Sequence, residues 1–424
     1  MKYNRLIEEL NNGALEKYSA LYADIDATKE RIISALNSFV STYGQDRDLM
    51  IFSVPGRSEL IGNHTDHNCG KVMAGAINRD IIAIAAKNND GVIRFRSEGY
   101  FEDKIKLSDI GSPNNFKKFT SRALVAGMAQ SFLNAGYEVG GYDAFSCTEV
   151  LKGSGLSSSA AFEVMVGNIL NHLYNGGSVD NKEIAKFAQY SENVYFGKPC
   201  GLMDQMACAV GGFVYIDFED NKNPEVESVN LSLGERGYSL CIVNTGGSHA
   251  NLNEDYASVP AEMKAVAAHF NRSVLRGLTE DDIIGAANEL RSAVGDRAIL
   301  RALHFIRENG RVVEAKDALK RDDLPAFLEV ILQSGRSSFQ YLQNVYTTKK
   351  VDEQGLSLAL ALTEGALAGK GCAFRVHGGG FAGTIQAFVK NEYLADYVRV
   401  MNSVFGEGAA MPLNIRPAGA IRLF

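Results

Sequence analysis

A short run of glycine and serine residues between two apolar segments most constrains what this chain can fold into. Residues 151–162 read LKGSGLSSSAAF, after the strand-like segment DAFSCTEV and before the helix-like segment FEVMVGNILNHLY. Small residues let backbone N–H groups come close to an anion, and the positive N-terminal end of the following helix points at it. The segment therefore predicts a phosphate-binding loop between a strand and a helix.

A purely structural role is the alternative for these residues. Serine is preferred at helix N-termini and glycine in turns, so a capped turn would use the same residue types. The segment is not a Walker loop, because no Gly-Lys-Ser or Gly-Lys-Thr follows the glycines. Taken alone, the segment leaves both alternatives open. Three serines and two alanines after two glycines are nevertheless more than capping requires.

The length of the chain indicates two domains. Single hydrophobic cores stop growing at about 250–300 residues, and this chain has 424 residues. It is 46% hydrophobic and 22% charged, a composition typical of folded globular proteins. A large core is therefore expected, with no disordered or fibrous part.

Composition also limits the partners and the compartment. The net charge is −7, and Lys and Arg are scattered, so no basic footprint for nucleic acid is present. No segment approaches the roughly 20 apolar residues that span a bilayer, and the charged N-terminal segment does not resemble a signal peptide. The six cysteines lack metal-ligand spacing, which favours a reduced compartment. We expect small-molecule partners, no nucleic acid or membrane, a cytoplasmic location, and a monomer or weak homodimer.

Hydrophobic periodicity predicts an α+β fold with two lobes, mixed sheets and helices, and an active site between the lobes. Helical spacing dominates the first forty-odd residues, and strand patterns begin at Leu49 with LMIFSVP, followed by a polar loop, RSELIGNHTDHNCG. The pattern of predicted strands and helices changes again near residues 225–240. The expected units are an N-terminal helical annex at 1–48, a domain with the phosphate loop at 49–230, and a second domain at 231–424. Further helices are expected at 118–136, 158–175, 181–195 and within 258–345, and strands at 72–100, 213–218, 239–245 and around the glycine turn of 372–389.

Two segments resemble a known kinase superfamily that contains galactokinase, homoserine kinase, mevalonate kinase and phosphomevalonate kinase. The loop resembles its Gly-Leu-(Ser/Gly)-Ser-Ser-Ala segment. Residues 55–68, PGRSELIGNHTDHN, resemble the galactokinase signature, normally Gly-Arg-x-Asn-Leu-Ile-Gly-Glu-His-Thr-Asp-Tyr. Carboxylates and imidazoles recognise sugar hydroxyls in fixed directions, so this second resemblance implies sugar binding at Asn63, His64 and Asp66.

A third segment implies the catalytic residues. Residues 198–205, KPCGLMDQ, resemble the family's Cys-Gly-Ile-Met-Asp-Gln, whose aspartate faces the hydroxyl to be phosphorylated. By this resemblance Asp204 is the catalytic carboxylate, Arg57 is the cation beside it, and Gly201 lies at the sugar. Glu192 matches the family glutamate that completes a magnesium site with a loop serine, Ser158 or Ser159.

The remaining implied contacts concern ATP and the sugar. Tyr256 aligns with a family tyrosine that contacts the sugar, although a packing role has equal weight. Residues 376–384, VHGGGFAGT, resemble a third family motif, whose glycines let backbone approach the substrate. The ATP-binding residues implied by the loop are Gly153, Ser154, Gly155, Leu156, Ser157, Ser158, Ser159 and Ala160.

The resemblance, which covers roughly residues 49–424, implies an ATP- and Mg²⁺-dependent sugar 1-kinase that converts galactose to galactose 1-phosphate. Three departures from the family pattern are present. His67 replaces the tyrosine, and no tryptophan is present, so Phe116 is a candidate for the adenine side. Asn63 replaces the family glutamate, which leaves the sugar open. Galacturonate and L-arabinose are therefore alternative substrates. A non-catalytic sugar sensor is disfavoured by the uninterrupted loop and by Asp204, and a mevalonate or homoserine kinase by the signature at 55–68.

Overall fold

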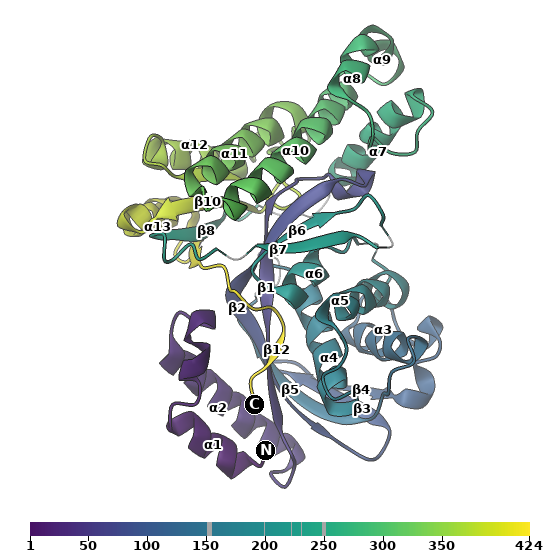
Figure 1. Ribbon diagram of the computed structural model, residues 1–424, viewed down its shortest axis with the longest axis vertical. Helices are drawn as coiled ribbons and strands as arrows, with labels where there is room; N and C mark the ends of the chain where they lie inside the picture. Colours follow the sequence, from purple (N-terminus) through teal and green to yellow (C-terminus); the bar gives the residue numbers. More distant parts are fainter. Residues whose placement is uncertain (151–154, 199, 222, 230, 248–251) are drawn as a thin grey trace.

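The computed structural model describes residues 1–150, 155–198, 200–221, 223–229, 231–247 and 252–424. The molecule is elongated, with two lobes stacked along its long axis, as Figure 1 shows. Each lobe has its own sheet covered by helices, which confirms the expected α+β architecture. In the described part of the chain, no helix combines the length and apolar content that crossing a bilayer requires.

The first lobe contains an eight-stranded sheet with the order β12-β1-β2-β5-β3-β4, to which β6 and β7 are added beside β2. Strands β3 and β5 pair in parallel, and β1 pairs with β2 and β12 in antiparallel fashion. The strands are β1 Met50–Ile61, β2 Lys71–Lys87, β3 Val92–Ser97, β4 Asp103–Lys106, β5 Tyr142–Thr148, β6 Phe213–Asp217, β7 Glu225–Val229 and β12 Ile421–Arg422.

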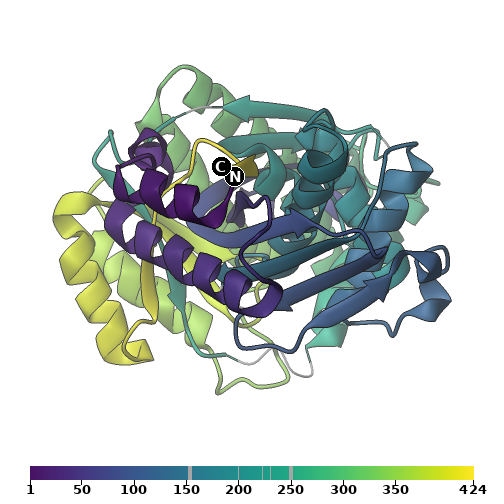
Figure 2. The same cartoon turned by 90° about the horizontal axis from the view of Figure 1, so that it is seen from below.

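Helices cover both faces of this sheet. One face carries α3 Ser121–Asn134, α4 Ser158–Tyr174, α5 Asn181–Tyr190 and α6 Met203–Val210. The other face carries α1 Tyr3–Asn11 and α2 Ile25–Tyr43, which lie side by side across the strands in Figure 2. Apolar residues of these two helices, such as Leu6, Ile32 and Phe39, pack on Ile51 and Ile82 of the sheet. Burial on both faces explains why β1 has no exposed alternate residues.

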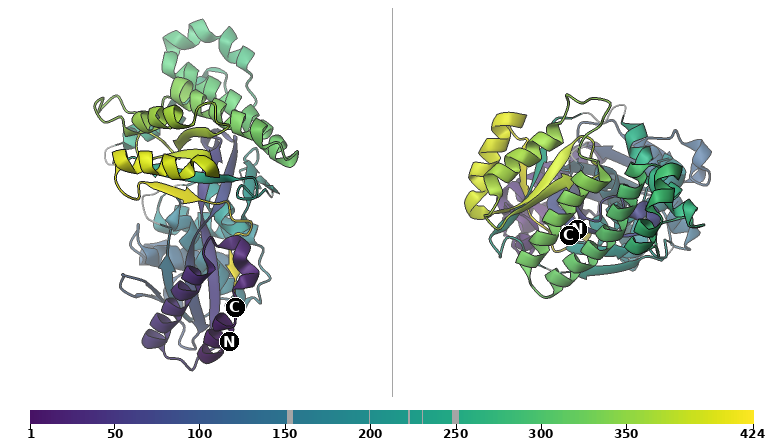
Figure 3. Two further views of the ribbon diagram at one scale, coloured as in Figure 1. Left: turned by 90° about the vertical axis from the view of Figure 1, so that its left-hand side faces the viewer. Right: turned by 90° about the horizontal axis from the view of Figure 1, so that it is seen from above.

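The second lobe contains a four-stranded sheet with the order β11-β8-β10-β9. Figure 3, seen from above, shows the green helices of this lobe lying over the strands. The strands are β8 Tyr238–Asn244, β9 Ala373–His377, β10 Thr384–Lys390 and β11 Ala410–Leu413. The helices are α7 Asn253–His269, α8 Glu280–Gly285, α9 Ala287–Ala293, α10 Asp296–Lys320, α11 Leu324–Ser337, α12 Gly355–Leu367 and α13 Asn391–Phe405.

The long hairpin of β1 and β2 joins the two lobes. One hydrophobic cluster extends from Val54 and Ile61 of β1 to Val312, Ile331 and Phe388 in the second lobe. The chain also returns to the first lobe at its end, where β12 pairs with β1 and the two termini lie close together. The lobes therefore share a core.

The expected polar loop after LMIFSVP is wrong in its first part. Residues 57–61 continue β1, pairing Arg57 with Ala76 and Glu59 with Ala74, with register shifts between Pro55 and Arg57 and between Glu59 and Ile61. Polar residues are tolerated inside this strand because the second lobe supplies partners for them, as Ser58 illustrates by its contacts with His377 and Gln386. The loop begins only after Gly62.

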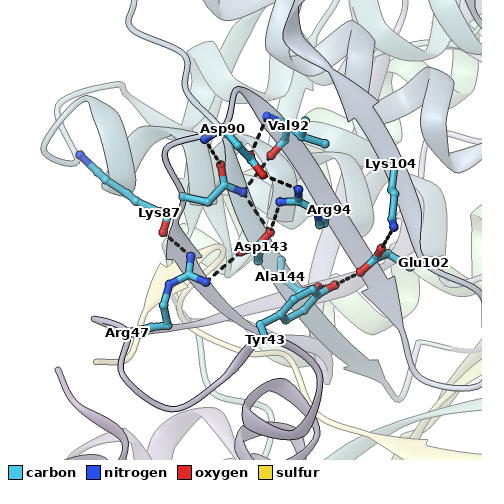
Figure 4. Close-up of polar contacts among 12 residues, drawn as sticks. Tyr43, Arg47, Lys87, Asp90, Val92, Arg94, Glu102, Lys104, Asp143 and Ala144 are labelled. Atoms are coloured by element: carbon cyan, nitrogen blue, oxygen red, sulfur yellow. Dashed lines mark hydrogen bonds and ion pairs between the residues drawn. The ribbon is translucent and has the colours of Figure 1, made fainter.

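Ion pairs fix the N-terminal helices to the sheet at two places. At the outer edge, Arg47 and Arg94 donate to the two oxygens of Asp143, each at 3.0 Å, and Tyr43 donates to Glu102 (Figure 4). Nearer the centre, Asp80 of β2 is 1% exposed and pairs with Arg31 of α2 and with the buried Arg416.

We expect Asp80→Asn to destabilise the fold strongly. The substitution leaves the Arg416 guanidinium, which is 0% exposed, without its counter-ion, and breaking such a pair costs about 3–5 kcal/mol. The free energy of unfolding in urea measures this loss. The matched control is Asp396→Asn, whose exposed pair with Arg399 should contribute less than about 1 kcal/mol. Equal losses in the two variants would contradict the assignment.

Candidate active site

The central contact of the site joins the polar end of β1 to the start of α6. Arg57 donates to both oxygens of Asp204, from Nε to Oδ1 and from Nη2 to Oδ2, each at 2.8 Å. Asp204 lies in the first turn of α6, where the helix dipole favours a negative charge. This two-point geometry fixes the plane of the carboxylate.

The same two residues contact the glycine–serine loop. The Ser157 hydroxyl donates to Asp204 Oδ2, and Arg57 Nη1 donates to the carbonyl of Gly155. The backbone N–H of Arg57 donates to the carbonyl of Leu156 at 3.1 Å. The predicted loop and the predicted catalytic carboxylate are therefore in direct contact. Gly153 and Ser154 lie outside the described residues.

The loop does not use its serine as a helix cap. Helix α4 begins at Ser158, and Ser157 before it has a left-handed backbone with φ of 56°. Its side chain makes no capping hydrogen bond and is committed to Asp204 instead. The N–H groups of the first turn, which contains Ser158, Ser159 and Ala160, are therefore not capped by a side chain. This arrangement is typical of an anion site at a helix N-terminus.

The surroundings of Asp204 keep it ionised. Burial would raise the pKa of this carboxyl, but the Arg57 charge and the hydrogen bonds from Arg57 and Ser157 outweigh burial and lower it. The aspartate is therefore a weak base with its charge held in place.

Glu192 lies beside the first turn of α4, in a helical turn at Ser191–Phe196. Its Oε1 accepts from Ser159 at 3.4 Å and from Lys198 at 3.3 Å, and its Oε2 accepts from Gln205 at 2.7 Å. No hydrogen bond joins Ser158 to Glu192 among the residues that the structure describes. The structure thus brings Ser159, rather than Ser158, into contact with the predicted metal ligand.

Sequence reasoning missed three residues around this glutamate. Gln205 and Lys198 hold its carboxylate, and Gln205 also donates to the buried Glu163 at 3.3 Å. Burial and the nearby Glu192 charge raise the pKa of Glu163 well above its usual range. Gln205 and Lys198 could have been found from the sequence, because both lie in segment 198–205, which resembles the family motif around the catalytic aspartate.

A pocket with a volume of about 150 Å³ lies near the start of α6. The predicted sugar residues Asn63, His64 and Asp66 line it, as does Met203, the neighbour of Asp204 in the chain. The other lining residues are Glu59, Gly62, His67, Val72 and Gly379. Gly201 adjoins the pocket, since a Cβ atom there would lie 3.0 Å from Asp66 Oδ2. The structure therefore brings these predicted residues together.

The glycine turn at 378–380 holds one wall of this pocket. Asn63 donates to the carbonyl of Gly378 at 2.7 Å. Burial lowers the pKa of His64 to about 4, so the imidazole is neutral at pH 7 and its Nε2 donates to the carbonyl of Gly379 at 2.9 Å. Tyr256 donates to Gly380 at 2.8 Å and packs on Phe381. Tyr256 is not among the residues that line the pocket, so it supports the turn.

Two buried histidines connect the lobes around the site. His377 contacts Ser58 at 3.1 Å and Thr384 at 2.8 Å. His304 contacts the carbonyl of Asn63 at 3.0 Å and Ser337 at 2.9 Å. Burial lowers the pKa of His377 to about 3 and that of His304 to about 4. Both are therefore neutral at pH 7.

We expect these histidines to make stability fall in mild acid. Their pKa is depressed on folding from about 6.5, so their contribution is full above pH 6.5 and is lost as pH falls toward 4. Each such histidine adds about 1.4 kcal/mol per pH unit to the slope of the unfolding free energy.

The measurement is urea unfolding at several pH values between 4.5 and 7 in the wild type and in His304→Gln. The variant should have a slope smaller by about 1.4 kcal/mol per pH unit, because one titrating group is gone. An unchanged slope would show that His304 does not titrate in this way.

Comparisons with known proteins agree with this geometry. Residues 37–87 match the galactokinase galactose-binding signature, and residues 123–212 match the GHMP kinases N terminal domain. Galactokinases from Streptomyces coelicolor and Clostridium tetani are each 30% identical, over 83% and 84% of this chain and 87% and 88% of their own length. The crystal structure of Lactococcus lactis galactokinase complexed with galactose is similar with a TM-score of 0.77 at 25% identity, covering 92% of this chain and 100% of that one. The chain is thus a member of the galactokinase family.

Proposed function

We propose that this protein transfers the terminal phosphoryl group of ATP to the anomeric hydroxyl of galactose, giving galactose 1-phosphate and ADP. Family membership and the two curated relatives named galactokinase support this reaction. The single observation that carries the proposal is the position of Asp204. Its carboxylate contacts Ser157 of the loop, and its neighbour Met203 lines the pocket that contains Asp66.

In this proposal the loop binds the nucleotide. Residues 153–160 surround the phosphates of ATP, with the uncapped N–H groups at the start of α4 as donors. Arg57 contributes positive charge next to the transferred group while its own position is fixed by Asp204 and Gly155. Most of the rate acceleration then comes from positioning and from charge neutralisation.

Asp204 orients the attacking hydroxyl and accepts its proton late. A carboxylate whose pKa is lowered by Arg57 and Ser157 against its burial is a far weaker base than a sugar alkoxide. Each unit of pKa mismatch costs about 1.36 kcal/mol, so early deprotonation is unfavourable. A loose, metaphosphate-like transition state needs little activation of the nucleophile, which allows late proton transfer.

Magnesium belongs to the same proposal, with Glu192 and a loop serine, Ser158 or Ser159, as its ligands. Their oxygen donors fit a hard cation, and Mg²⁺ in kinases is held by one or two protein groups together with the phosphates. In keeping with this, no group of three His, Cys, Asp or Glu side chains placed to share an ion occurs among the described residues. The ion would neutralise charge on the phosphates.

Further parts of the proposal concern the sugar and the whole chain. Asn63, His64, Asp66 and Gly201 form the sugar site, and Tyr256 supports it through the glycine turn. We keep the unit boundaries at 1–48, 49–230 and 231–424, a cytoplasmic location, and a monomer or weak homodimer as predictions.

The substrate is tested by ADP release with ATP and galactose, N-acetylgalactosamine, galacturonate or L-arabinose. The proposal expects galactose to be the best of the four. A rate with galacturonate far above that with galactose would change the substrate while leaving the sugar kinase class intact. ATP hydrolysis that no sugar accelerates would contradict the proposed function.

The role of Asp204 is tested by Asp204→Asn. We expect turnover of galactose to fall by about 10²–10⁴-fold, because the group that orients the hydroxyl and receives its proton is lost. Binding of ATP, measured by calorimetry, should persist since the loop is intact. Asp352→Asn, at an exposed turn, is the matched control and should keep full activity. Near-normal turnover in Asp204→Asn would refute the role.

A further inference from the structure

The sugar-binding signature has exchanged two residue types in this chain. The family pattern has an amide residue at the position of Glu59 and a carboxylate residue at the position of Asn63. Here the carboxylate is at 59 and the amide is at 63. Position 59 lies on β1 instead of in a loop, and Glu59 and Asn63 both line the pocket that Met203 also lines. The two side chains are in direct contact, with Asn63 Nδ2 donating to Glu59 Oε1 at 3.0 Å.

The protein already uses most of the hydrogen-bonding capacity of Asn63. Its Nδ2 donates to Glu59 and to the carbonyl of Gly378, and its Oδ1 accepts from Asn344 Nδ2 at 2.6 Å. The side chain is also 1% exposed. Both donors and one acceptor site are therefore occupied before any ligand enters. Asn63 acts as a connection between β1 and the glycine turn.

Glu59, in contrast to Asn63, keeps hydrogen-bonding capacity that the protein does not use. Only its Oε1 accepts a hydrogen bond, and no described residue donates to Oε2. Glu59 is 8% exposed and lines the pocket. Among the described residues, Oε2 is not one of the buried side-chain atoms that lack a partner, so it is open to the pocket that Glu59 lines, where a ligand hydroxyl can donate to it. Arg375, although close enough to influence the charge of Glu59, donates to the carbonyl of Leu60 instead.

The charges that line the pocket limit its ligand. Glu59 and Asp66 are both carboxylate residues, and no Lys or Arg is among the lining residues. His64 is neutral at pH 7, since burial lowers its pKa to about 4. Burial raises the pKa of Glu59, and the nearby charges of Arg375 and Arg57 act against this rise. A ligand carboxylate placed here would lie against two acidic residues, with no lysine or arginine lining the pocket to pair with it, which is unfavourable.

We propose that Glu59, and not residue 63, supplies the carboxylate that accepts a sugar hydroxyl, and that with Asp66 it selects a neutral sugar over a sugar acid. The inference rests on the proposed function and deepens it, because it assigns a specificity-determining residue to the sugar pocket. It also favours galactose or L-arabinose over galacturonate.

The first test is Glu59→Gln, which keeps the shape of the side chain and an acceptor for Asn63. An unmatched hydrogen bond to a charged acceptor costs about 1.5–3 kcal/mol, so the KM for galactose should rise about 10–100-fold with a smaller change in kcat. The preference for galactose over galacturonate should fall at least tenfold. A KM within twofold of wild type together with an unchanged preference would overturn the inference.

Deoxygenated substrates give a sharper test of direct contact. Galactose lacking one hydroxyl, at C2, C3, C4 or C6, is compared with galactose in both wild type and Glu59→Gln. One of these sugars should lose about tenfold or more in kcat/KM with wild type and little with the variant, because both changes remove the same contact. Equal sensitivity of both enzymes to all four sugars would contradict contact with Glu59.

Failure of this inference is distinguishable from failure of the proposed function. Absence of galactose phosphorylation by wild type would refute the function. Calorimetric binding of galactose to wild type and Glu59→Gln still tests Glu59 in that case, because it needs no turnover. A wild type that prefers galacturonate to galactose would overturn the inference and leave a sugar kinase.

Discussion

The bidentate pair between Arg57 and Asp204 is the contact on which the rest of the site depends. It joins β1, α6 and the loop before α4, three segments that are far apart in the sequence. The pair is only partly buried, and further hydrogen bonds from Ser157 and to the Gly155 carbonyl hold its geometry. The plane of the Asp204 carboxylate is consequently fixed against the loop before α4.

The second constraint is the polar layer where the lobes meet. Residues 57–63 of the first lobe are matched by partners from the second: His377 for Ser58, and the glycine turn and Asn344 for Asn63. Gly380 must be glycine there, because a Cβ atom would lie 2.0 Å from the carbonyl oxygen of Asn344. The pocket that we propose for the sugar is lined by Glu59, Asn63 and Gly379 of this layer.

The sequence allowed prediction of the fold class, of the helix after the loop and of the residues that converge on Asp204, because local patterns and motifs carry this information. Residues 57–61 were wrongly expected in a loop, since their burial depends on partners more than 300 positions away. From the sequence alone, Asn63 indicates that the carboxylate of the family pattern is missing from the site. The sequence shows a carboxylate at 59 and an amide at 63, and the structure adds that these two side chains are in direct contact. The choice between Ser158 and Ser159 likewise needed the three-dimensional position of Glu192.

The most direct test of the account is the identity of the product. The protein, galactose, ATP and magnesium are incubated together, and the phosphorylated sugar is examined by ³¹P and ¹H nuclear magnetic resonance. A phosphate bonded to C1 of galactose, formed in equal amount with ADP, is the result that the position of Asp204 predicts. Phosphate on another carbon, or inorganic phosphate alone, would show that the cleft between the loop and Asp204 does not hold the two substrates as described.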